Sequence, residues 1–238
     1  MKTAIREKLY QLSLGGYQDI AADFSRTRQS LIWPPLMKII ATIPEGAKVL
    51  DLGCGTGRLL RHTGGKHFNY LGVDNSQAML TIAKKDYPDK KFILGDVLKL
   101  DANEIISNSA PFDYIFSVAM IHHLPGVEWR LESVRQSLRV LGPEGELLII
   151  VRNFWSKKEF RSRLIKATIR KIIGLNPYDY GDLVYPWKNS QGKVIGQRYY
   201  HVFTKKGLKK LGRQSGARII SLNKDNYNYY LTLGSKGF

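Results

Sequence analysis

The sequence predicts an α/β protein with a doubly wound, mostly parallel seven-stranded sheet that ends in an antiparallel hairpin. Three observations predict it. Apolar runs alternate with helical patterns up to residue 151, the first run leads into a glycine-rich turn, and two apolar runs close the chain. At 238 residues, one such domain with additions is expected. The predicted strands cover 47–52, 70–74, 91–94, 112–118, 146–151, 217–222 and 227–233, and the predicted helices cover 57–63, 76–86 and 127–141.

The glycine-rich turn at residues 49–57 is the most informative stretch of the chain. An apolar run ends in an acid, and three glycines follow at alternate positions. Glycine has no Cβ and reaches positive φ, so the backbone here can approach a ligand closely. The spacing differs from the G-x-G-x-x-G of dinucleotide sites, and the acid favours a cationic ligand. The only cysteine of the chain lies in this turn, which excludes an internal disulfide and a multi-cysteine metal site, and we predict no metal.

Two further apolar runs also end in acids. Asp74 closes the second run, about twenty residues after the turn, where an acid accepts both hydroxyls of a ribose. Asp96 closes the third run, where we expect it to receive an adenine amine. Over residues 45–151 these features resemble the class I S-adenosylmethionine (SAM) methyltransferases, which have a Rossmann-like fold. The resemblance implies SAM as cofactor, bound by Tyr17, Asp51, Gly53, Cys54, Gly55, Gly57, Asp74, Asn75, Asp96, Val97 and Ser117.

Positive charge is concentrated in the last third of the chain. Residues 1–151 carry 18 Lys and Arg against 16 Asp and Glu, whereas residues 152–238 carry 19 against 4. Such a confined basic field is typical of a polyanion site, so nucleic acid is the leading predicted partner. An anionic membrane surface and a merely solvated lysine-rich surface are the competing readings. A helical projection of 156–173 gives one basic face, Arg163, Lys166 and Arg170, and other faces that we expect to be buried, with Phe160, Leu164, Ile165, Ile169 and Ile172.

A narrower resemblance rests on three segments. They are the opening at 17–28 followed by Trp33 and Pro34, the motif Ser-Val-Ala-Met-Ile-His-His-Leu at 117–124, and the pair 182–188 and 198–203. These segments resemble the tRNA wobble-uridine carboxymethyl methyltransferases of yeast and animals. The resemblance implies methylation of the carboxylate of 5-carboxymethyluridine in the anticodon region of tRNA, and a small activator subunit as a further partner. It implies Arg28, His122, His123 and Arg198 as catalytic residues and Arg163, Lys166, Arg170, Trp187, Tyr199, Tyr200 and His201 as substrate or RNA contacts.

Two other classes of function stay open at this stage. A methyltransferase acting on a quinone precursor or another metabolite would share the SAM site, and so would a non-catalytic SAM-binding or RNA-binding subunit. The chain has no apolar run of 18 residues and no signal-peptide pattern, so we expect a cytoplasmic protein without membrane insertion. We expect four regions: an N-terminal helical segment at 1–44 that contributes to the site, a SAM-binding core at 45–151, a basic substrate-recognition insertion and helix at 152–216, and a closing β-hairpin at 217–238.

Overall fold

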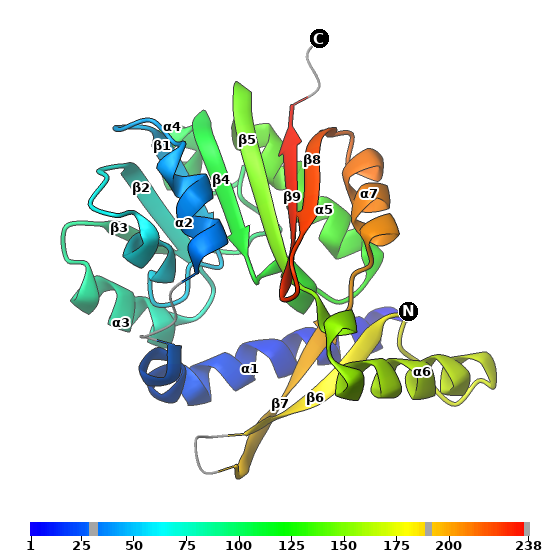
Figure 1. Ribbon diagram of the computed structural model, residues 1–238. Helices are drawn as coiled ribbons and strands as arrows, with labels where there is room; N and C mark the ends of the chain where they lie inside the picture. Colours follow the sequence, from blue (N-terminus) through cyan, green and yellow to red (C-terminus); the bar gives the residue numbers. More distant parts are fainter. Residues whose placement is uncertain (29–32, 189–191, 236–238) are drawn as a thin grey trace.

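The chain folds around a seven-stranded sheet with the strand order β3-β2-β1-β4-β5-β9-β8 (Figure 1). A computed structural model describes the backbone of residues 1–28, 33–188 and 192–235, and the side chains of residues 1–15, 33–187 and 192–235. The first five strands run parallel, and β9 lies antiparallel to both β5 and β8, which confirms the predicted fold. The strands are β1 (Lys48–Leu52), β2 (Asn69–Asp74), β3 (Lys91–Leu94), β4 (Phe112–Val118), β5 (Leu141–Arg152), β8 (Arg218–Lys224) and β9 (Asn228–Gly234).

The helices agree with the sequence prediction at two of the three expected places. The third, predicted at 57–63, is a short 3-10 helix that begins after Gly57, whose φ of 74° is left-handed. The six-residue α4 was not predicted, because it is too short to show an amphipathic period. The helices are α1 (Thr3–Arg28), α2 (Pro34–Ala41), α3 (Gln77–Asp86), α4 (Glu104–Ser109), α5 (Val127–Val140), α6 (Lys158–Ile172) and α7 (Lys205–Gln214), with 3-10 helices η1 (Arg58–His62), η2 (Ile121–His123) and η3 (Phe154–Ser156).

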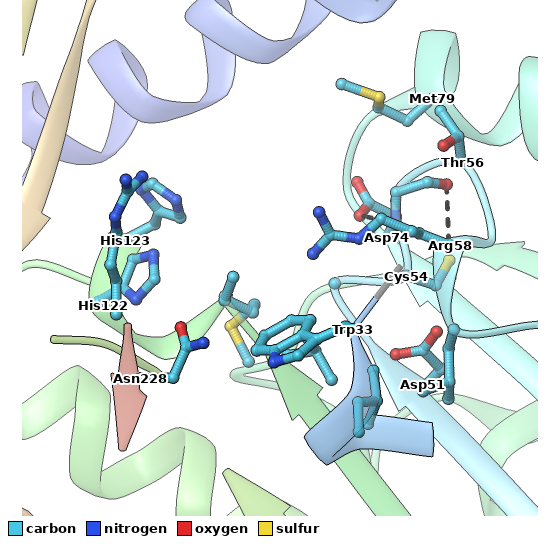
Figure 2. Close-up of a pocket in the computed structure, with 18 of the residues that line it drawn as sticks. Trp33, Asp51, Cys54, Thr56, Arg58, Asp74, Met79, His122, His123 and Asn228 are labelled. Atoms are coloured by element: carbon cyan, nitrogen blue, oxygen red, sulfur yellow. Dashed lines mark hydrogen bonds between the residues drawn. The ribbon is translucent and has the colours of Figure 1, made fainter. Parts of the chain in front are cut away.

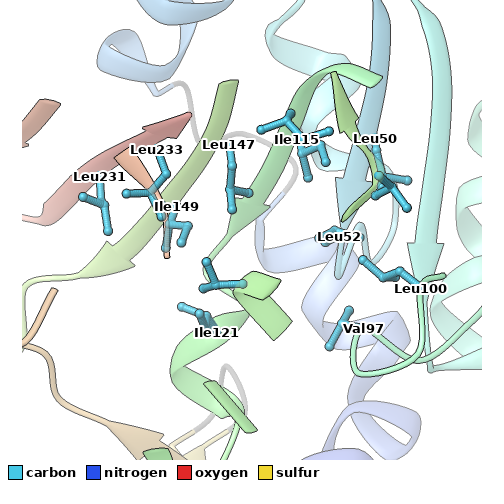
Figure 3. Close-up of a cluster of buried hydrophobic side chains, with 14 of the residues drawn as sticks. Leu50, Leu52, Val97, Leu100, Ile115, Ile121, Leu147, Ile149, Leu231 and Leu233 are labelled. Atoms are coloured by element: carbon cyan, nitrogen blue, oxygen red, sulfur yellow. The ribbon is translucent and has the colours of Figure 1, made fainter. Parts of the chain in front are cut away.

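Apolar side chains are buried on both faces of the sheet, as a doubly wound fold requires. One cluster contains Leu50 and Leu52 of β1 with residues of the central and closing strands (Figure 3). Val49, which directly precedes Leu50, belongs to the cluster on the opposite face, together with Leu36 and Ile40 of α2. Successive strand residues point to opposite faces, so the apolar residues of β1 contribute to both clusters. This packing on both faces holds β1 in place up to its last residue, Leu52, directly before the glycine turn.

A second, two-stranded sheet lies beyond the carboxyl ends of the parallel strands (Figure 1). It is formed by β6 (Asp182–Lys188) and β7 (Val194–His201), which pair antiparallel, and β7 contacts α1. The carboxyl ends of parallel strands are where ligands bind in open α/β sheets. The hairpin and α1 therefore cover the side of the sheet at which a ligand is expected.

Helix α6 differs from its expected packing. Phe160 and Leu164 are buried, and they pack with residues of β6 and β7. Ile165, Ile169 and Ile172, which were expected to be buried, are instead 57%, 53% and 70% exposed. The hairpin covers only one side of the helix, so a second apolar stripe faces outward. None of the described helices is long and apolar enough to cross a membrane.

Candidate active site

A cavity of about 660 Å³ opens at the carboxyl ends of the parallel strands. Its side chains form two groups on opposite sides (Figure 2). The group around the glycine turn, which we call the cofactor side, contains Asp51, Cys54, Thr56, Arg58, Asp74 and Met79. The group opposite, which we call the acceptor side, contains His122, His123, Arg152, Arg198, Tyr200 and Asn228.

The three glycines of the turn all have positive φ: 68° at Gly53, 54° at Gly55 and 74° at Gly57. These values are left-handed and unfavourable for residues with a Cβ. A Cβ on Gly53 would lie 2.5 Å from the Cγ of Met120. The turn therefore requires glycine for its own conformation as well as for the approach of a ligand.

Asp74 at the end of β2 holds this turn in place. Its carboxylate accepts the backbone N–H of Gly55 across 2.8 Å and that of Ser76 across 2.9 Å. Burial raises the pKa of Asp74, and the backbone hydrogen bonds from Ser76 and Gly55 partly offset the increase. Each carboxylate oxygen retains acceptor capacity on the cavity wall, as the predicted ribose contact needs. The neighbouring Asn75 also lines the cavity.

Asp51 is the buried acid of the cofactor side. It is 2% exposed and accepts a hydrogen bond of 2.8 Å from the hydroxyl of Tyr70. Burial raises the pKa of Asp51 to about 7, although the bond from Tyr70 lowers it. A cation bound beside this carboxylate would favour its ionised form. The geometry thus fits the cationic sulfonium and amino-acid part of SAM.

Five other predicted cofactor residues differ in whether they reach the cavity. Val97 lines the cavity, but Asp96 does not, and its carboxylate accepts the backbone N–H of Leu98 in a local turn. Ser117 is buried within β4 and does not line the cavity. Tyr17 and the predicted catalytic Arg28 belong to the part of α1 whose side chains lie outside the described residues. Cys54 is buried and lines the cavity.

His122 and His123 follow β4 on the short helix η2, with ring centroids 4.5 Å apart. The Nδ1 of His123 lies 3.0 Å from the carbonyl oxygen of Tyr199. Burial and the charge of Arg198 lower the pKa of His123 to about 3. Burial, with the neighbouring His123 as a further cause, also moves the pKa of His122 well below its usual value. Both imidazoles are therefore neutral hydrogen-bonding groups at physiological pH.

The β6–β7 hairpin brings Arg198 to the cavity. The guanidinium of Arg198 stacks on the ring of Trp187 and lies 5.6 Å from the ring centroid of Tyr200. Tyr200 lines the cavity, whereas Trp187 is buried behind Arg198 and does not line it. Trp187 therefore supports the arginine rather than contacting the cavity itself.

Tyr199 and His201 point to the other side of β7. Tyr199 is fully buried, and its hydroxyl donates to Asp182 across 2.7 Å and accepts from Arg130 across 3.2 Å. His201 lies 2.8 Å from the same carboxylate oxygen of Asp182. Neither residue lines the cavity, and the buried hydroxyl of Tyr199 is bonded within the protein, so its position favours a role in the core over the expected substrate contact.

The three predicted phosphate contacts on α6 are exposed and lie outside the cavity. Arg163 forms an ion pair of 3.4 Å with Glu159, and its guanidinium lies 5.1 Å from the ring centroid of Tyr185. Lys166 and Arg170 project from the same basic face. Over the described residues, no group of three or more His, Cys, Asp or Glu side chains gathers in a way that could hold a metal ion.

Sequence reasoning missed Arg152 and Asn228, which the structure places on the acceptor side. They pair with each other across β5 and β9. The available signal was position alone, because Arg152 ends a strand of a parallel sheet and such ends face the ligand.

Comparisons with known proteins agree with this geometry. A family model described as a methyltransferase domain matches residues 49–145. The Schizosaccharomyces pombe tRNA (carboxymethyluridine(34)-5-O)-methyltransferase is 26% identical over 233 residues, which cover 90% of this chain and 92% of that protein. The Mus musculus tRNA (carboxymethyluridine(34)-5-O)-methyltransferase ALKBH8 is 32% identical over 164 residues, which cover 68% of this chain but 23% of that longer protein.

Solved structures share the fold. A DhpI–SAM–HEP complex matches with a TM-score of 0.68 at 18% identity, over 94% of this chain and 97% of that chain. A chain from the complex between the Haloferax volcanii Trm112 methyltransferase activator and its methyltransferase partner matches with a TM-score of 0.64 at 16% identity. The match covers 95% of this chain and 99% of that chain. With the strand order, the glycine turn and the methyltransferase-domain match, these findings identify the family. The chain belongs to the class I SAM-dependent methyltransferases.

Proposed function

We propose that this protein transfers the methyl group of SAM to the carboxylate of 5-carboxymethyluridine at the wobble position of tRNA. The observation that carries the proposal is a single cavity that joins the cofactor side to a cationic acceptor side with neutral histidines. The likeness to the Schizosaccharomyces pombe enzyme over nine tenths of the chain supports the choice of substrate.

The residues of the acceptor side fit a reaction that moves no proton. SAM supplies a methyl group activated by its sulfonium, and an ionised carboxylate attacks it without a general base. His122 and His123 are neutral and buried, so they are suited to hydrogen bonding rather than to charge stabilisation. Arg198 presents a planar guanidinium, which binds a carboxylate in a defined orientation.

Trp33 forms the part of the cavity wall that lies between the two groups in Figure 2, and a chain of hydrogen bonds holds it in place. The indole N–H of Trp33 donates to the hydroxyl of Tyr230 across 2.9 Å, and that hydroxyl donates to Asp225 across 2.6 Å. A fixed wall limits the positions that an acceptor can take and excludes water from the reacting atoms. Trp33 thereby contributes alignment rather than chemistry.

The tRNA would lie across the basic last third of the chain. Exposed cations on α6 and α7 supply phosphate contacts, and Tyr200 supplies an aromatic ring in the cavity for an extruded base. The exposed cations of α6 and α7 outside the cavity include Arg163, Lys166, Arg170, Lys205, Lys206, Lys209, Lys210 and Arg213.

A small activator subunit is a further proposed partner, since a solved relative is in complex with one. The proposed location is the cytoplasm, where such a tRNA would be met.

A methyl-transfer assay tests the proposal. Radiolabelled SAM is incubated with the protein and either tRNA that carries 5-carboxymethyluridine or tRNA whose wobble uridine is unmodified. Label is expected in the first pool alone, because the unmodified base offers no carboxylate. Equal label in both pools, or label in neither alongside efficient methylation of a quinone precursor, would contradict the proposal. Mass spectrometry of the digested nucleosides identifies the methylated position.

A further inference from the structure

Arg152 is a half-buried cation on the cavity wall that no sequence motif marks. It ends β5 and stands beside Asn228 of β9. Among the described side chains, its guanidinium makes no hydrogen bond or ion pair, and it lies 5.7 Å from the ring centroid of Phe154. A guanidinium at a cavity wall without a carboxylate partner is available to an anion that enters the cavity.

A carboxylate that lines the same cavity, Asp225, has no ion pair with Arg152. It accepts the hydroxyl of Tyr230 and the backbone N–H groups of Tyr227 and Asn228, each across 2.6 Å. These three donors come from β9 and from the residue that precedes it, and they hold the Asp225 carboxylate in place. The charge of Arg152 is therefore left for a ligand.

His122 provides a second, independent sign of a missing ligand. Its side chain is 3% exposed and lines the cavity, and its Nδ1 has no hydrogen-bond partner among the described residues. Buried polar atoms are nearly always paired, by protein, water or ligand. After burial and His123, the charges of Arg152 and Arg198 contribute to the low pKa of His122, so both arginines act on this imidazole.

The chemistry of these groups selects the ligand. A guanidinium only donates hydrogen bonds, and a neutral imidazole protonated at Nδ1 also donates from that atom. Donors together with net positive charge fit an anionic oxygen better than a neutral amide or a hydroxyl. A carboxylate can place one oxygen among these donors and leave the other oxygen toward the cofactor side.

We propose that Arg152 and His122 form a subsite that binds one oxygen of the acceptor carboxylate and selects a charged acceptor over a neutral one. This inference rests on the proposed function. The free oxygen forms a bond to the methyl carbon while the bond from that carbon to sulfur breaks, and the electron pair stays on sulfur. No proton moves. The ester product is neutral, so it pairs less well with Arg152, which favours its release.

The test compares two anticodon stem-loops that differ at the wobble position. One carries 5-carboxymethyluridine and the other carries 5-carbamoylmethyluridine, which is neutral and of nearly the same shape. Their dissociation constants are measured by calorimetry with S-adenosylhomocysteine bound, and kcat and KM are measured on the carboxymethyl form with SAM. The variants are Arg152→Gln, Arg152→Lys and His122→Asn, and the control is Arg135→Gln, an exposed cation on α5 outside the cavity.

The wild-type protein and Arg135→Gln are expected to bind the carboxymethyl stem-loop about tenfold or more tightly than the carbamoyl one, as a charge-assisted contact implies. Arg152→Gln should bring this ratio close to one and lower kcat/KM by a similar factor, with SAM affinity unchanged. Arg152→Lys should retain part of the ratio, which a purely structural role of the arginine would not explain. If Arg152→Gln binds the carboxymethyl stem-loop with the full wild-type preference, the subsite is overturned. Should Arg152→Gln fail to fold, the full wild-type preference in both Arg152→Lys and His122→Asn would overturn it.

The same measurements separate this inference from the proposed function. Should the wild-type protein not methylate the carboxymethyl tRNA yet prefer the carboxymethyl stem-loop through Arg152, the subsite stands and the proposed reaction fails. Should it methylate that tRNA with an unchanged preference in Arg152→Gln, the reaction stands and the subsite fails. A wild-type protein without any preference for the charged stem-loop would also overturn the subsite.

Discussion

The backbone N–H of Gly55 donates to the carboxylate of Asp74 across 2.8 Å, so the acid that ends β2 anchors the middle of the turn that follows β1. The other carboxylate oxygen accepts the N–H of Ser76 at the start of α3. Asp74 thus connects the turn, its own strand and the next helix. Sequence position alone assigned it to a ribose, but its first role is to hold the surface on which the cofactor rests.

We expect Asp74→Ala to weaken SAM binding by about tenfold or more, because charge-assisted hydrogen bonds of about 1.5–3 kcal/mol each are lost and the turn loses its anchor. Asp74→Asn keeps one acceptor oxygen, so its SAM affinity should lie between those of Asp74→Ala and the wild type. Calorimetry with SAM measures both. Asp96→Ala is a matched control, since Asp96 lies off the cavity, and it should have the smaller effect. Unchanged SAM affinity in Asp74→Ala would remove this acid from the cofactor site.

The pKa of Asp51, raised by burial to about 7, predicts a pH dependence of SAM binding. The ionised fraction of such a group rises from about one tenth at pH 6 to about nine tenths at pH 8. Because a cationic ligand favours the ionised carboxylate, SAM affinity should increase about tenfold over that range. The Asp51→Asn variant should bind weakly with a flat profile through the same pH values. A wild-type profile that matches the variant would mean that Asp51 does not titrate against the ligand.

The parts of the fold that local pattern determines could be predicted. The apolar runs locate the parallel strands, and the positive φ values of Gly53, Gly55 and Gly57 follow from a residue type that tolerates them. The alternation of strand residues also predicts that Tyr199 and Tyr200 face opposite sides. It cannot tell which of the two faces the cavity, since that depends on Asp182 and Arg130, which are distant in sequence.

The rest required tertiary structure. A helical projection finds the apolar residues of α6, yet only the position of the β6–β7 hairpin decides that Leu164 is covered and Ile169 is not. Arg152 has no local signature, because its place on the cavity wall depends on the pairing of β5 with β9. Trp187 was expected to touch substrate, but the guanidinium of Arg198 lies over its ring.

The basic face of α6 should contribute to the salt dependence of tRNA binding. Replacing Arg163, Lys166 and Arg170 together with glutamine should make the log–log slope shallower by up to about two to three units. Of the three residues, Arg163 should contribute least to the salt dependence, because Glu159 already pairs with its charge. SAM affinity should stay as in the wild type. The control replaces Lys84, Lys85 and Lys91, exposed on the cofactor half, and should leave the slope unchanged. A slope unmoved by the α6 variant would show that this face does not contact phosphates.

Arg198→Lys separates the geometry of the guanidinium from its charge. Lysine keeps a positive charge but loses the planar fork and the stacking on Trp187. We expect kcat on carboxymethyl tRNA to fall while SAM affinity survives, because Arg198 lies on the acceptor side. The same outcome is predicted for Arg28→Lys. Single-turnover kinetics with calorimetry measure both quantities, and full turnover by Arg198→Lys would remove the arginine from acceptor orientation.

Tyr199→Phe tests the assignment of this tyrosine to the core. The change keeps the buried ring but removes the hydroxyl that donates to Asp182 and accepts from Arg130. Leaving these buried groups with one partner fewer should lower the free energy of unfolding by about 1–3 kcal/mol. Urea unfolding measures the loss, and the control Tyr180→Phe, at a 61% exposed residue outside the cavity, should change it by no more than about 0.5 kcal/mol. At a temperature where both variants are folded, kcat/KM for tRNA should match the wild type. Unchanged stability together with a loss of kcat/KM would instead make Tyr199 a substrate contact.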